Sequence, residues 1–179
     1  MKILVIVDMQ NDFINMALAN KDAEAVVKPI VELTKNYNDI ILTRDTHYSN
    51  YMETQEGRKL PIPHCIYGTE GWDINMEILN AVDKKNIAFL DKPNFGATED
   101  AIRNAIYKDL LIAQNAKIDS IDIVGTCTDI CVVSNALTIK HMFPETEVNI
   151  IANCCAGLTP EKHEHALDVM TSCQCNIIR

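Results

Sequence analysis

Side chains that could act as acid, base, cation, metal ligand or nucleophile follow several short apolar runs of the chain. They are Asp8, Asp45, His47, Lys92, Cys127 and Cys131. The apolar runs predict β-strands, and the carboxyl ends of parallel strands meet at one edge of a sheet. A carboxylate, an ammonium group and a thiol are therefore expected together, which suits nucleophilic catalysis by a cysteine. Each residue alone is equally compatible with a solvated or capping role.

Cys131 is the candidate nucleophile of this group. Thr128 and Asp129 mark a helix start, which places Cys131 in the first helical turn. Free N–H groups and the helix dipole favour a thiolate there, and a nearby Lys92 ammonium would lower the pKa of the thiol further. From spacing alone, the alternative is that Cys131 is a buried small hydrophobe, the commonest role of a free cysteine.

The elements that must position these side chains can be read from the apolar pattern. Continuous rather than alternating apolar runs predict strands that are buried on both faces, as in a parallel sheet. The runs are residues 3–7, 40–42, 87–90, 121–124, 148–151 and the short 176–178. Segments of helical pattern separate them, so the alternation predicts a three-layer αβα fold with an open, mainly parallel sheet of about six strands.

Helical periodicity covers residues 22–36, where Pro29 predicts a kink or a later start. Three further helices are expected to begin at threonine N-caps. These are Thr98, Thr128 and Thr159. Residues 46–75 are rich in proline and glycine and weakly periodic, so they predict a long irregular loop, which in compact domains is usually functional.

The composition narrows the class of protein. A length of 179 residues with 47% hydrophobic content fits one domain, residues 1–179. A net charge of −9 argues against nucleic acid and anionic membranes as partners. The apolar runs are shorter than the roughly 20 residues that a membrane helix needs, so a cytoplasmic protein is expected. Seven cysteines without paired C-x-x-C spacing indicate neither a disulfide framework nor a zinc ribbon.

Three segments resemble the signature segments of the isochorismatase-like cysteine hydrolases. They are residues 8–13 (Asp-Met-Gln-Asn-Asp-Phe), 92–98 (Lys-Pro-Asn-Phe-Gly-Ala-Thr) and 125–132 (Gly-Thr-Cys-Thr-Asp-Ile-Cys-Val). Residues 45–47 (Asp-Thr-His) and 63–65 (Pro-His-Cys) resemble the metal-binding segments of the nicotinamidase branch. The resemblance spans nearly the whole chain and implies a Rossmann-type strand order.

The resemblance also implies an activity. A nicotinamidase-like chain would convert nicotinamide and water to nicotinate and ammonia through a thioester on Cys131. Asp8 would be the acid/base and Lys92 the cation of the triad. The oxyanion hole would use the backbone N–H groups of Cys127 and Cys131, with a cis peptide between Thr126 and Cys127. Such groups meet the needs of amide hydrolysis, which are a nucleophile, a proton for the leaving amine and donors for the oxyanion.

A metal site is a further implication. Asp45 and His47 are two residues apart, so an extended backbone projects both to the same side, and the resemblance adds His64 as third ligand. One carboxylate and two imidazoles suit a divalent metal such as zinc, with iron and manganese as alternatives. Without the resemblance, an Asp-x-His sequence occurs by chance. Phe13 would form a wall of the substrate pocket, although a core aromatic is an equally good interpretation.

Two departures from the family pattern affect the pocket. Many nicotinamidases carry Trp-Pro before the second metal histidine, whereas residues 61–64 read Pro-Ile-Pro-His. An aromatic wall is therefore missing unless Trp72 or Tyr67 supplies it. Cys127 stands where a small residue is usual, and this second thiol leaves room for redox inhibition.

The remaining candidates favour structural roles. His163 and His165 lie two apart on a predicted helix and are expected on the surface. The other cysteines are expected to be strand-end or core thiols. They are Cys154, Cys155, Cys173 and Cys175. Two alternatives stay open beside a nicotinamidase acting on a small-molecule amide: a sister hydrolase of another amide, a carbamoyl group or a vinyl ether, and a non-catalytic binding protein. A homo-oligomer is also compatible with such a sheet.

Overall fold

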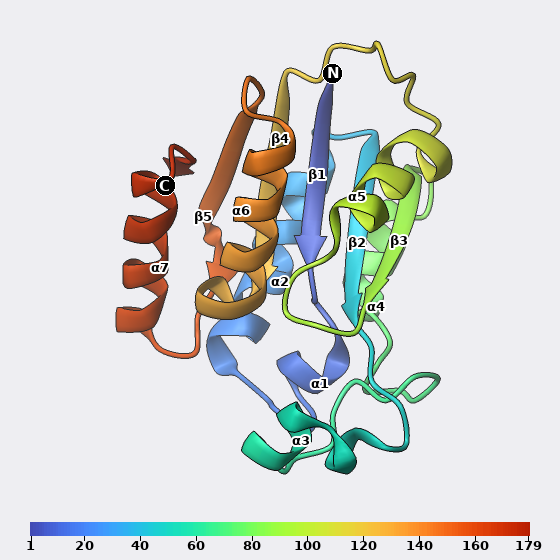
Figure 1. Ribbon diagram of the computed structural model, residues 1–179, viewed down its shortest axis with the longest axis vertical. Helices are drawn as coiled ribbons and strands as arrows, with labels where there is room; N and C mark the ends of the chain where they lie inside the picture. The colour runs from blue at the N-terminus through green and yellow to red at the C-terminus, as the bar shows by residue number, and fades with distance from the viewer.

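A six-stranded sheet forms the centre of the molecule (Figure 1). The computed structural model describes residues 1–179. The strands are β1 (Lys2–Val7), β2 (Asp39–Asp45), β3 (Asn86–Lys92), β4 (Ser120–Thr126), β5 (Glu147–Ala156) and β6 (Asn176–Ile178). They lie in the order β3-β2-β1-β4-β5-β6, and every neighbouring pair is parallel. The predicted open sheet in Rossmann-type order is confirmed, and it is wholly rather than mainly parallel.

Several strands extend past their apolar runs toward the carboxyl edge. Asp45 and Lys92 are the last residues of β2 and β3 and pair with each other in the ladder, whereas the sequence placed both beyond the strands. β5 reaches Ala156, well past the predicted end at residue 151. Backbone hydrogen bonds to the neighbouring strand continue where the side chains become polar, so an apolar run marks only the buried centre of a strand.

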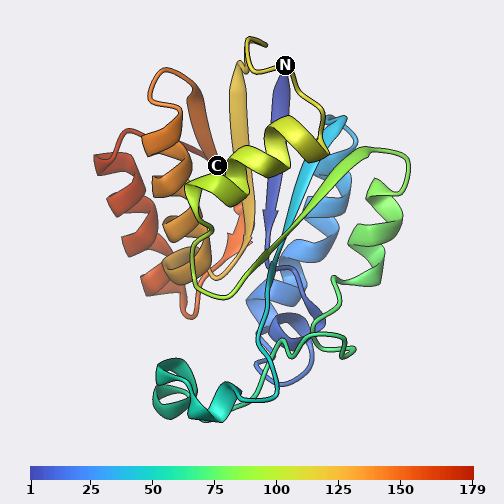
Figure 2. The same cartoon turned by 45° about the vertical axis from the view of Figure 1, so that its right-hand side comes forward.

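Helices cover both faces of the sheet (Figure 2). α2 (Lys21–Thr34) and α4 (Met76–Val82) cover one face. α5 (Glu99–Asn104), the π-helical turn η2 (Ala105–Asp109), α6 (Val133–Met142) and α7 (Pro160–Ser172) cover the other. Each face has its own core, of 17 and 27 buried residues, which explains why the strands are apolar on both sides.

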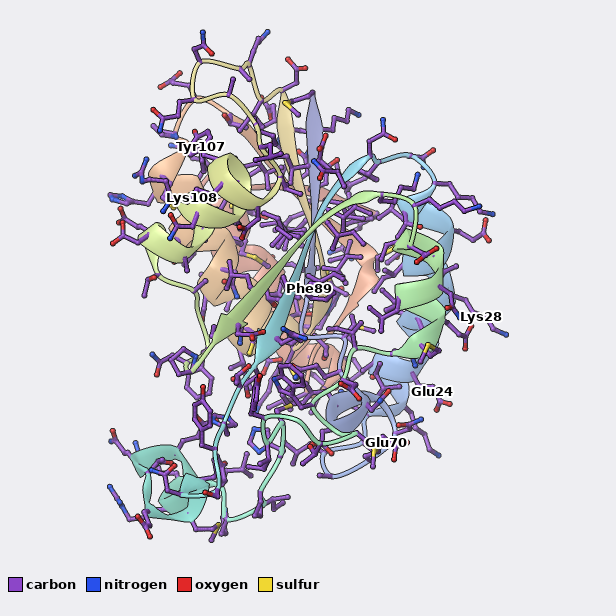
Figure 3. The ribbon with its side chains drawn as sticks, turned by 90° about the vertical axis from the view of Figure 1, so that its right-hand side faces the viewer. Glu24, Lys28, Glu70, Phe89, Tyr107 and Lys108 are labelled. Carbon is purple, nitrogen blue, oxygen red and sulfur yellow. The ribbon has the colours of Figure 1, made fainter.

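The layers are visible from the edge of the sheet (Figure 3). Phe89 marks the edge strand β3 between the two helical layers, with Lys28 of α2 on one side and Tyr107 of η2 on the other. None of the helices combines the length and the apolar character that a membrane crossing requires.

Two of the three predicted threonine N-caps are confirmed. Thr98 and Thr159 accept hydrogen bonds from N–H groups in the first turns of α5 and α7, as predicted. α2 begins at Lys21 behind an Asn20 cap and runs through Pro29 to its end, so the predicted later start is wrong. Pro29 is tolerated because it is exposed, where water can bond the carbonyl group that proline leaves unpaired.

Residues 46–75 form the predicted long connection beyond the carboxyl ends of the strands (Figure 2). The connection is irregular apart from the 3₁₀ turn η1 (Tyr51–Glu53) and the short helix α3 (Gln55–Lys59). The other helix at this end is α1 (Asn11–Ile14), whose Asp12 Oδ2 accepts a 2.7 Å hydrogen bond from the Cys65 N–H. That bond fastens the loop beside the end of β1.

Candidate active site

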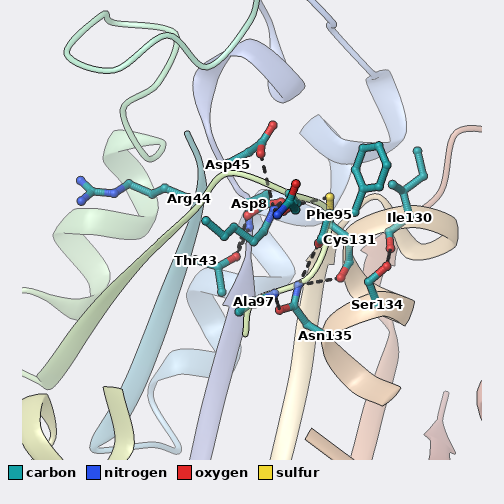
Figure 4. Close-up of polar contacts among 12 residues, drawn as sticks. Asp8, Thr43, Arg44, Asp45, Phe95, Ala97, Ile130, Cys131, Ser134 and Asn135 are labelled. Carbon is teal, nitrogen blue, oxygen red and sulfur yellow. Dashed lines mark hydrogen bonds and ion pairs between the residues drawn. The ribbon is translucent and has the colours of Figure 1, made fainter. Parts of the chain in front are cut away.

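Asp8, Lys92 and Cys131 meet at the carboxyl edge of the sheet (Figure 4). Lys92 Nζ lies 2.7 Å from Asp8 Oδ2 and 3.7 Å from Cys131 Sγ. Asp8 is fully buried, and Lys92 and Cys131 are 1% and 7% exposed. The structure therefore brings together the three residues that the sequence predicted as acid/base, cation and nucleophile.

Asp8 is held by the neighbouring strand. It leaves β1 with a φ of 48°, a left-handed conformation that aspartate tolerates. Thr43 Oγ1 on β2 donates to Asp8 Oδ1 at 2.6 Å and accepts from the Asp8 N–H at 3.1 Å. One carboxylate oxygen thus faces Thr43 and the other faces Lys92, which fixes the plane of the carboxylate.

Lys92 lies between two carboxylates. Besides its contact with Asp8, Nζ lies 3.7 Å from Asp45 Oδ1 and donates to the Asn94 carbonyl at 3.1 Å. Burial alone would lower the pKa of Lys92, but the charges of Asp8, Cys131 and Asp45 raise it above its ordinary value. The ammonium group therefore stays charged although it is buried.

Cys131 lies in the π-helical turn η3 (Thr128–Val132), which leads directly into α6. Cys127 occupies the N-cap position and makes no side-chain cap bond. The prediction that Thr128 caps this helix is wrong, because its hydroxyl is hydrogen-bonded at 2.8 Å to Nδ1 of His163 on α7. The Thr128 hydroxyl therefore bonds to a residue of another helix and not to the N–H groups in the first turn of its own helix.

The turn is entered through a cis peptide bond between Thr126 and Cys127, as the resemblance implied. Cys127 and Cys131 both face the same cavity. Their backbone N–H groups are the two that the resemblance implies as donors to the oxyanion.

The electrostatics of the thiol differ from the sequence-based expectation. Burial and the Asp8 carboxylate raise the pKa of Cys131 well above its ordinary value, and Lys92 offsets only part of this. Burial also raises the pKa of Asp8, against the lowering effect of Lys92. The expected low pKa of Cys131 is wrong because desolvation outweighs the helix terminus and the cation. Desolvation therefore favours the neutral thiol of Cys131 over the thiolate.

A second polar cluster lies next to the triad. It consists of Asp45, His47, Glu56 and His64, whose nearest ligand atoms all lie within 4.8 Å of one another. Asp45 Oδ2 lies 2.9 Å from His47 Nε2 and 3.5 Å from His64 Nε2. The structure therefore brings together the three predicted metal ligands and adds Glu56, whose Oε1 lies 3.7 Å from His47 Nε2.

The donor atoms of this cluster fit a divalent metal ion. Nε2 of His47 is buried and lies 2.9 Å from Asp45 Oδ2 without the geometry of a hydrogen bond, as expected of two ligand atoms that face one ion. His64 Nδ1 lies 2.9 Å from the Ile62 carbonyl, which can only accept, so Nδ1 carries the proton and Nε2 is free to coordinate. Two imidazoles and two carboxylates are a ligand set that zinc and related metals accept.

Gln10 positions Asp45. Its Oε1 accepts from the Asp45 N–H at 2.7 Å, and its Nε2 donates to the carbonyls of Asp45 and Trp72 at 2.9 and 2.8 Å. Burial would raise the pKa of Asp45, but the imidazoles of His47 and His64 and the Lys92 ammonium hold it well below its usual range. Asp45 is therefore an anionic ligand that is already oriented.

A cavity of about 240 Å³ opens onto both clusters. Its lining includes Cys127 and Cys131 as well as Asp45, Glu56 and His64 of the metal cluster. The remaining wall is mostly apolar and includes Phe13, Leu18, Leu60, Phe95, Ile130 and Leu158. The cavity can hold a small ring between the thiol and the metal ligands.

The aromatic side of the cavity is built differently from the prediction. Phe13 lies at the cavity with its ring 5.6 Å from that of His64. Trp72 and Tyr67 do not line the cavity: Trp72 Nε1 donates to Thr46 Oγ1 at 2.9 Å, and Tyr67 is 58% exposed. Phe95, three residues after Lys92, supplies the second aromatic wall instead.

The remaining histidines and cysteines lie partly on the surface and partly in the interior. His165 is exposed, but His163 is half-buried through its bond to Thr128, so the prediction that both lie on the surface is wrong for His163. All seven cysteines are free. Cys154, Cys155 and Cys175 are buried as predicted, whereas Cys173 is exposed at the end of α7.

Two residues of the site were not predicted from the sequence. Glu56 lies in the first turn of α3, and only the return of the long loop brings it to His47 and His64. Asn135 of α6 is buried and hydrogen-bonded to the backbone of Cys131. Its spacing of four residues from Cys131 places both on one helical face, which is the one local indication that was available.

Comparison with known proteins agrees with this geometry. The isochorismatase domain model matches residues 2–179. The nicotinamidase of Saccharomyces cerevisiae is 27% identical over 188 aligned residues, covering 83% of this chain and 85% of the yeast protein. The nicotinamidase/pyrazinamidase of Mycobacterium tuberculosis is 24% identical over 186 residues, covering 99% and 98% of the two chains.

A solved structure is similar over the whole fold. The crystal structure of the nicotinamidase/pyrazinamidase of Bacillus subtilis superimposes with a TM-score of 0.79 at 25% sequence identity, covering 99% of each chain. From the match over residues 2–179 and the shared architecture, the chain belongs to the isochorismatase domain family.

Proposed function

We propose that this protein is a nicotinamidase-type amidohydrolase that hydrolyses nicotinamide to nicotinate and ammonia. One observation carries the proposal: Cys131 of the buried Asp8–Lys92–Cys131 group lines the same cavity of about 240 Å³ as three residues of the metal cluster, Asp45, Glu56 and His64. The relatives named nicotinamidase, which align over most of their length, support the choice of substrate.

The chain's own residues can perform the chemistry in two stages. The Asp8 carboxylate takes the thiol proton as the Cys131 sulfur attacks the amide carbonyl, and returns the proton to the departing ammonia. The backbone N–H groups of Cys127 and Cys131 donate to the oxyanion. Asp8 then accepts a proton from the water that attacks the thioester and passes it to the departing sulfur, which releases nicotinate and restores both the Cys131 thiol and the Asp8 carboxylate.

The raised pKa values of Asp8 and Cys131 suit this sequence of steps. Burial raises the pKa of the Cys131 thiol and so favours its neutral form, which requires a base to take the proton as the sulfur attacks; the raised pKa of Asp8 makes its carboxylate a stronger base. Lys92 stays charged beside both groups and stabilises whichever of them is anionic. The site thus keeps one proton between carboxylate and sulfur, balanced by one fixed ammonium group.

Asp45, His47, Glu56 and His64 would hold the divalent metal, with zinc favoured by the ligand types and iron and manganese as alternatives. When bound, the metal supplies open coordination positions that a pyridine ring nitrogen can occupy. Phe13 and Phe95 would enclose the ring and exclude water, and would leave the amide group facing Cys131.

The test is ammonia release from nicotinamide by metal-loaded protein. We expect Cys131→Ala to abolish turnover and Cys173→Ala, which removes an exposed thiol, to leave it unchanged. Activity that survives Cys131→Ala would refute the mechanism. Metal analysis of the same preparation and a panel of amides and carbamoyl compounds complete the test. Turnover of another substrate without bound metal would favour a sister hydrolase. The cytoplasmic location and the homo-oligomer stay predictions.

A further inference from the structure

Asn135 is a buried polar side chain next to the triad that the reaction scheme does not use. It lies on α6, four residues after Cys131, and is 1% exposed. Its Nδ2 donates to the Cys131 carbonyl at 2.7 Å and to the Phe95 carbonyl at 3.3 Å, and its Oδ1 accepts from the Ala97 N–H at 3.0 Å. One side chain therefore joins the backbone of the nucleophile turn to a separate segment (Figure 4).

That second segment, residues 93–97, connects β3 to α5 and carries two parts of the site. The Asn94 carbonyl accepts from Lys92 Nζ, and Phe95 forms a wall of the cavity. The segment lies close to the start of α6, since a Cβ atom added to Gly96 would come within 3.2 Å of Ser134 Cβ. Where this segment lies relative to Cys131 sets the distance from thiol to ammonium and the width of the cavity.

We propose that Asn135 is a positioning residue for the amidohydrolase reaction. Its hydrogen bonds hold residues 93–97 against the turn that carries Cys131. The inference rests on the function proposed above. An amide fits this task because it donates to two carbonyls and accepts from an N–H at the same time, which a carboxylate or an apolar side chain cannot do. Asn135 touches neither the substrate nor the reacting atoms and acts through the segments that it joins.

Two substitutions distinguish the hydrogen bond to the Cys131 carbonyl from the hydrogen bonds to residues 93–97. Asn135→Ser keeps a hydroxyl that can donate to the carbonyl four residues earlier, that of Cys131, but is too short to reach residues 93–97. Asn135→Leu is similar in size to asparagine and loses all three hydrogen bonds. Thr138→Val is the matched control, because Thr138 Oγ1 makes the same kind of bond, to the Ser134 carbonyl at 3.0 Å, one turn further from the site.

The first measurement is steady-state hydrolysis of nicotinamide by the metal-loaded variants. We expect Asn135→Ser to raise KM roughly tenfold while kcat stays within about threefold, because the Phe95 wall is loosened but the nucleophile turn is not. Asn135→Leu is expected to lower kcat roughly tenfold as well, since small displacements of reacting groups are costly. Thr138→Val should stay within about twofold of wild type in both constants.

The second measurement does not depend on substrate. Amide hydrogen exchange, followed by mass spectrometry, should become faster in residues 93–98 of both Asn135 variants and stay unchanged in Thr138→Val. If wild-type protein releases no ammonia from nicotinamide, the proposed function fails, and exchange alone then decides whether Asn135 locks the segment. Unchanged exchange in Asn135→Leu, or wild-type KM and kcat in folded Asn135→Leu, would overturn the inference.

Discussion

Asp8 shows how three neighbours set the protonation of one side chain. Burial and the negative charge of Asp45 favour the neutral acid, whereas the Lys92 ammonium and the hydroxyl of Thr43 favour the carboxylate. The net effect is a pKa above the ordinary carboxyl value. A base needs to be a carboxylate, so activity should fall as the pH falls through this raised pKa, and the acid limb should lie above the usual carboxyl range.

Thr43→Val tests this balance. The change keeps the shape of the side chain but removes the 2.6 Å hydrogen bond that favours the Asp8 carboxylate. The pKa of Asp8 should rise further, which should move the acid limb of kcat/KM for nicotinamide upward by about one pH unit, the equivalent of a hydrogen bond to a charged group. Thr43→Ser retains the hydroxyl and should restore the wild-type profile. An acid limb that stays in place in Thr43→Val would argue against Asp8 as the base.

At the scale of elements, the end of β4 must lie very close to β1 where the catalytic turn begins. Gly125 has a φ of +119°, and a Cβ atom there would lie 2.1 Å from the Val7 carbonyl oxygen. No other residue type can adopt this conformation in this space. The glycine thus allows β4, which ends just before Cys127, to pass directly beside β1, which ends just before Asp8.

Gly125→Ala should therefore be costly. We expect the free energy of unfolding, measured in urea, to fall by roughly 3 kcal/mol or more from combined strain and overlap, with loss of amidase activity in whatever protein folds. Gly68→Ala is the control, because Gly68 also has a positive φ, of 79°, but nothing within 4 Å of an added Cβ. It should cost about 1 kcal/mol from the backbone alone. Equal losses at the two positions would contradict the close approach of the strands.

At the scale of the whole molecule, the metal cluster gathers four side chains from residues 45–64 that come within ligand distance of one another only when the long loop folds. Asp45 ends β2, while Glu56 and His64 come from different points of the long loop. Such a site exists only in the folded protein, so binding of the metal should stabilise the fold.

Chelation should reveal this linkage. A metal present at a hundred times its dissociation constant adds about 2.7 kcal/mol, which corresponds to a Tm that is roughly 5 to 10 °C higher for a chain of this size. We expect EDTA to remove this increment together with amidase activity. His64→Ala should show no difference with and without EDTA, whereas His165→Ala, at an exposed position, should behave like wild type. Identical Tm values for wild type in both conditions would count against the metal site.

The sequence was sufficient where local rules decide the outcome. Continuous apolar runs placed the six strands, threonine caps placed the starts of α5 and α7, and the strand ends placed Asp8, Lys92 and Cys131 at one edge. These features follow from short-range patterns and from the geometry of parallel sheets. The strand limits were less accurate, because ladder hydrogen bonds continue past the last apolar residue.

Only the tertiary structure decided features that depend on burial and on contacts between distant segments. The pKa of Cys131 is raised rather than lowered because its desolvation is set by the packing around it. His163 bonds to Thr128 across two elements, and Glu56 reaches the histidines through the folded loop. Asn135 accepts a hydrogen bond from the Ala97 N–H, 38 positions earlier in the chain. The sequence by itself determined which reactive groups the chain offers at the edge of its sheet. Their protonation, their partners and the shape of the cavity were decided by tertiary packing, because desolvation and long-range proximity have no local signature.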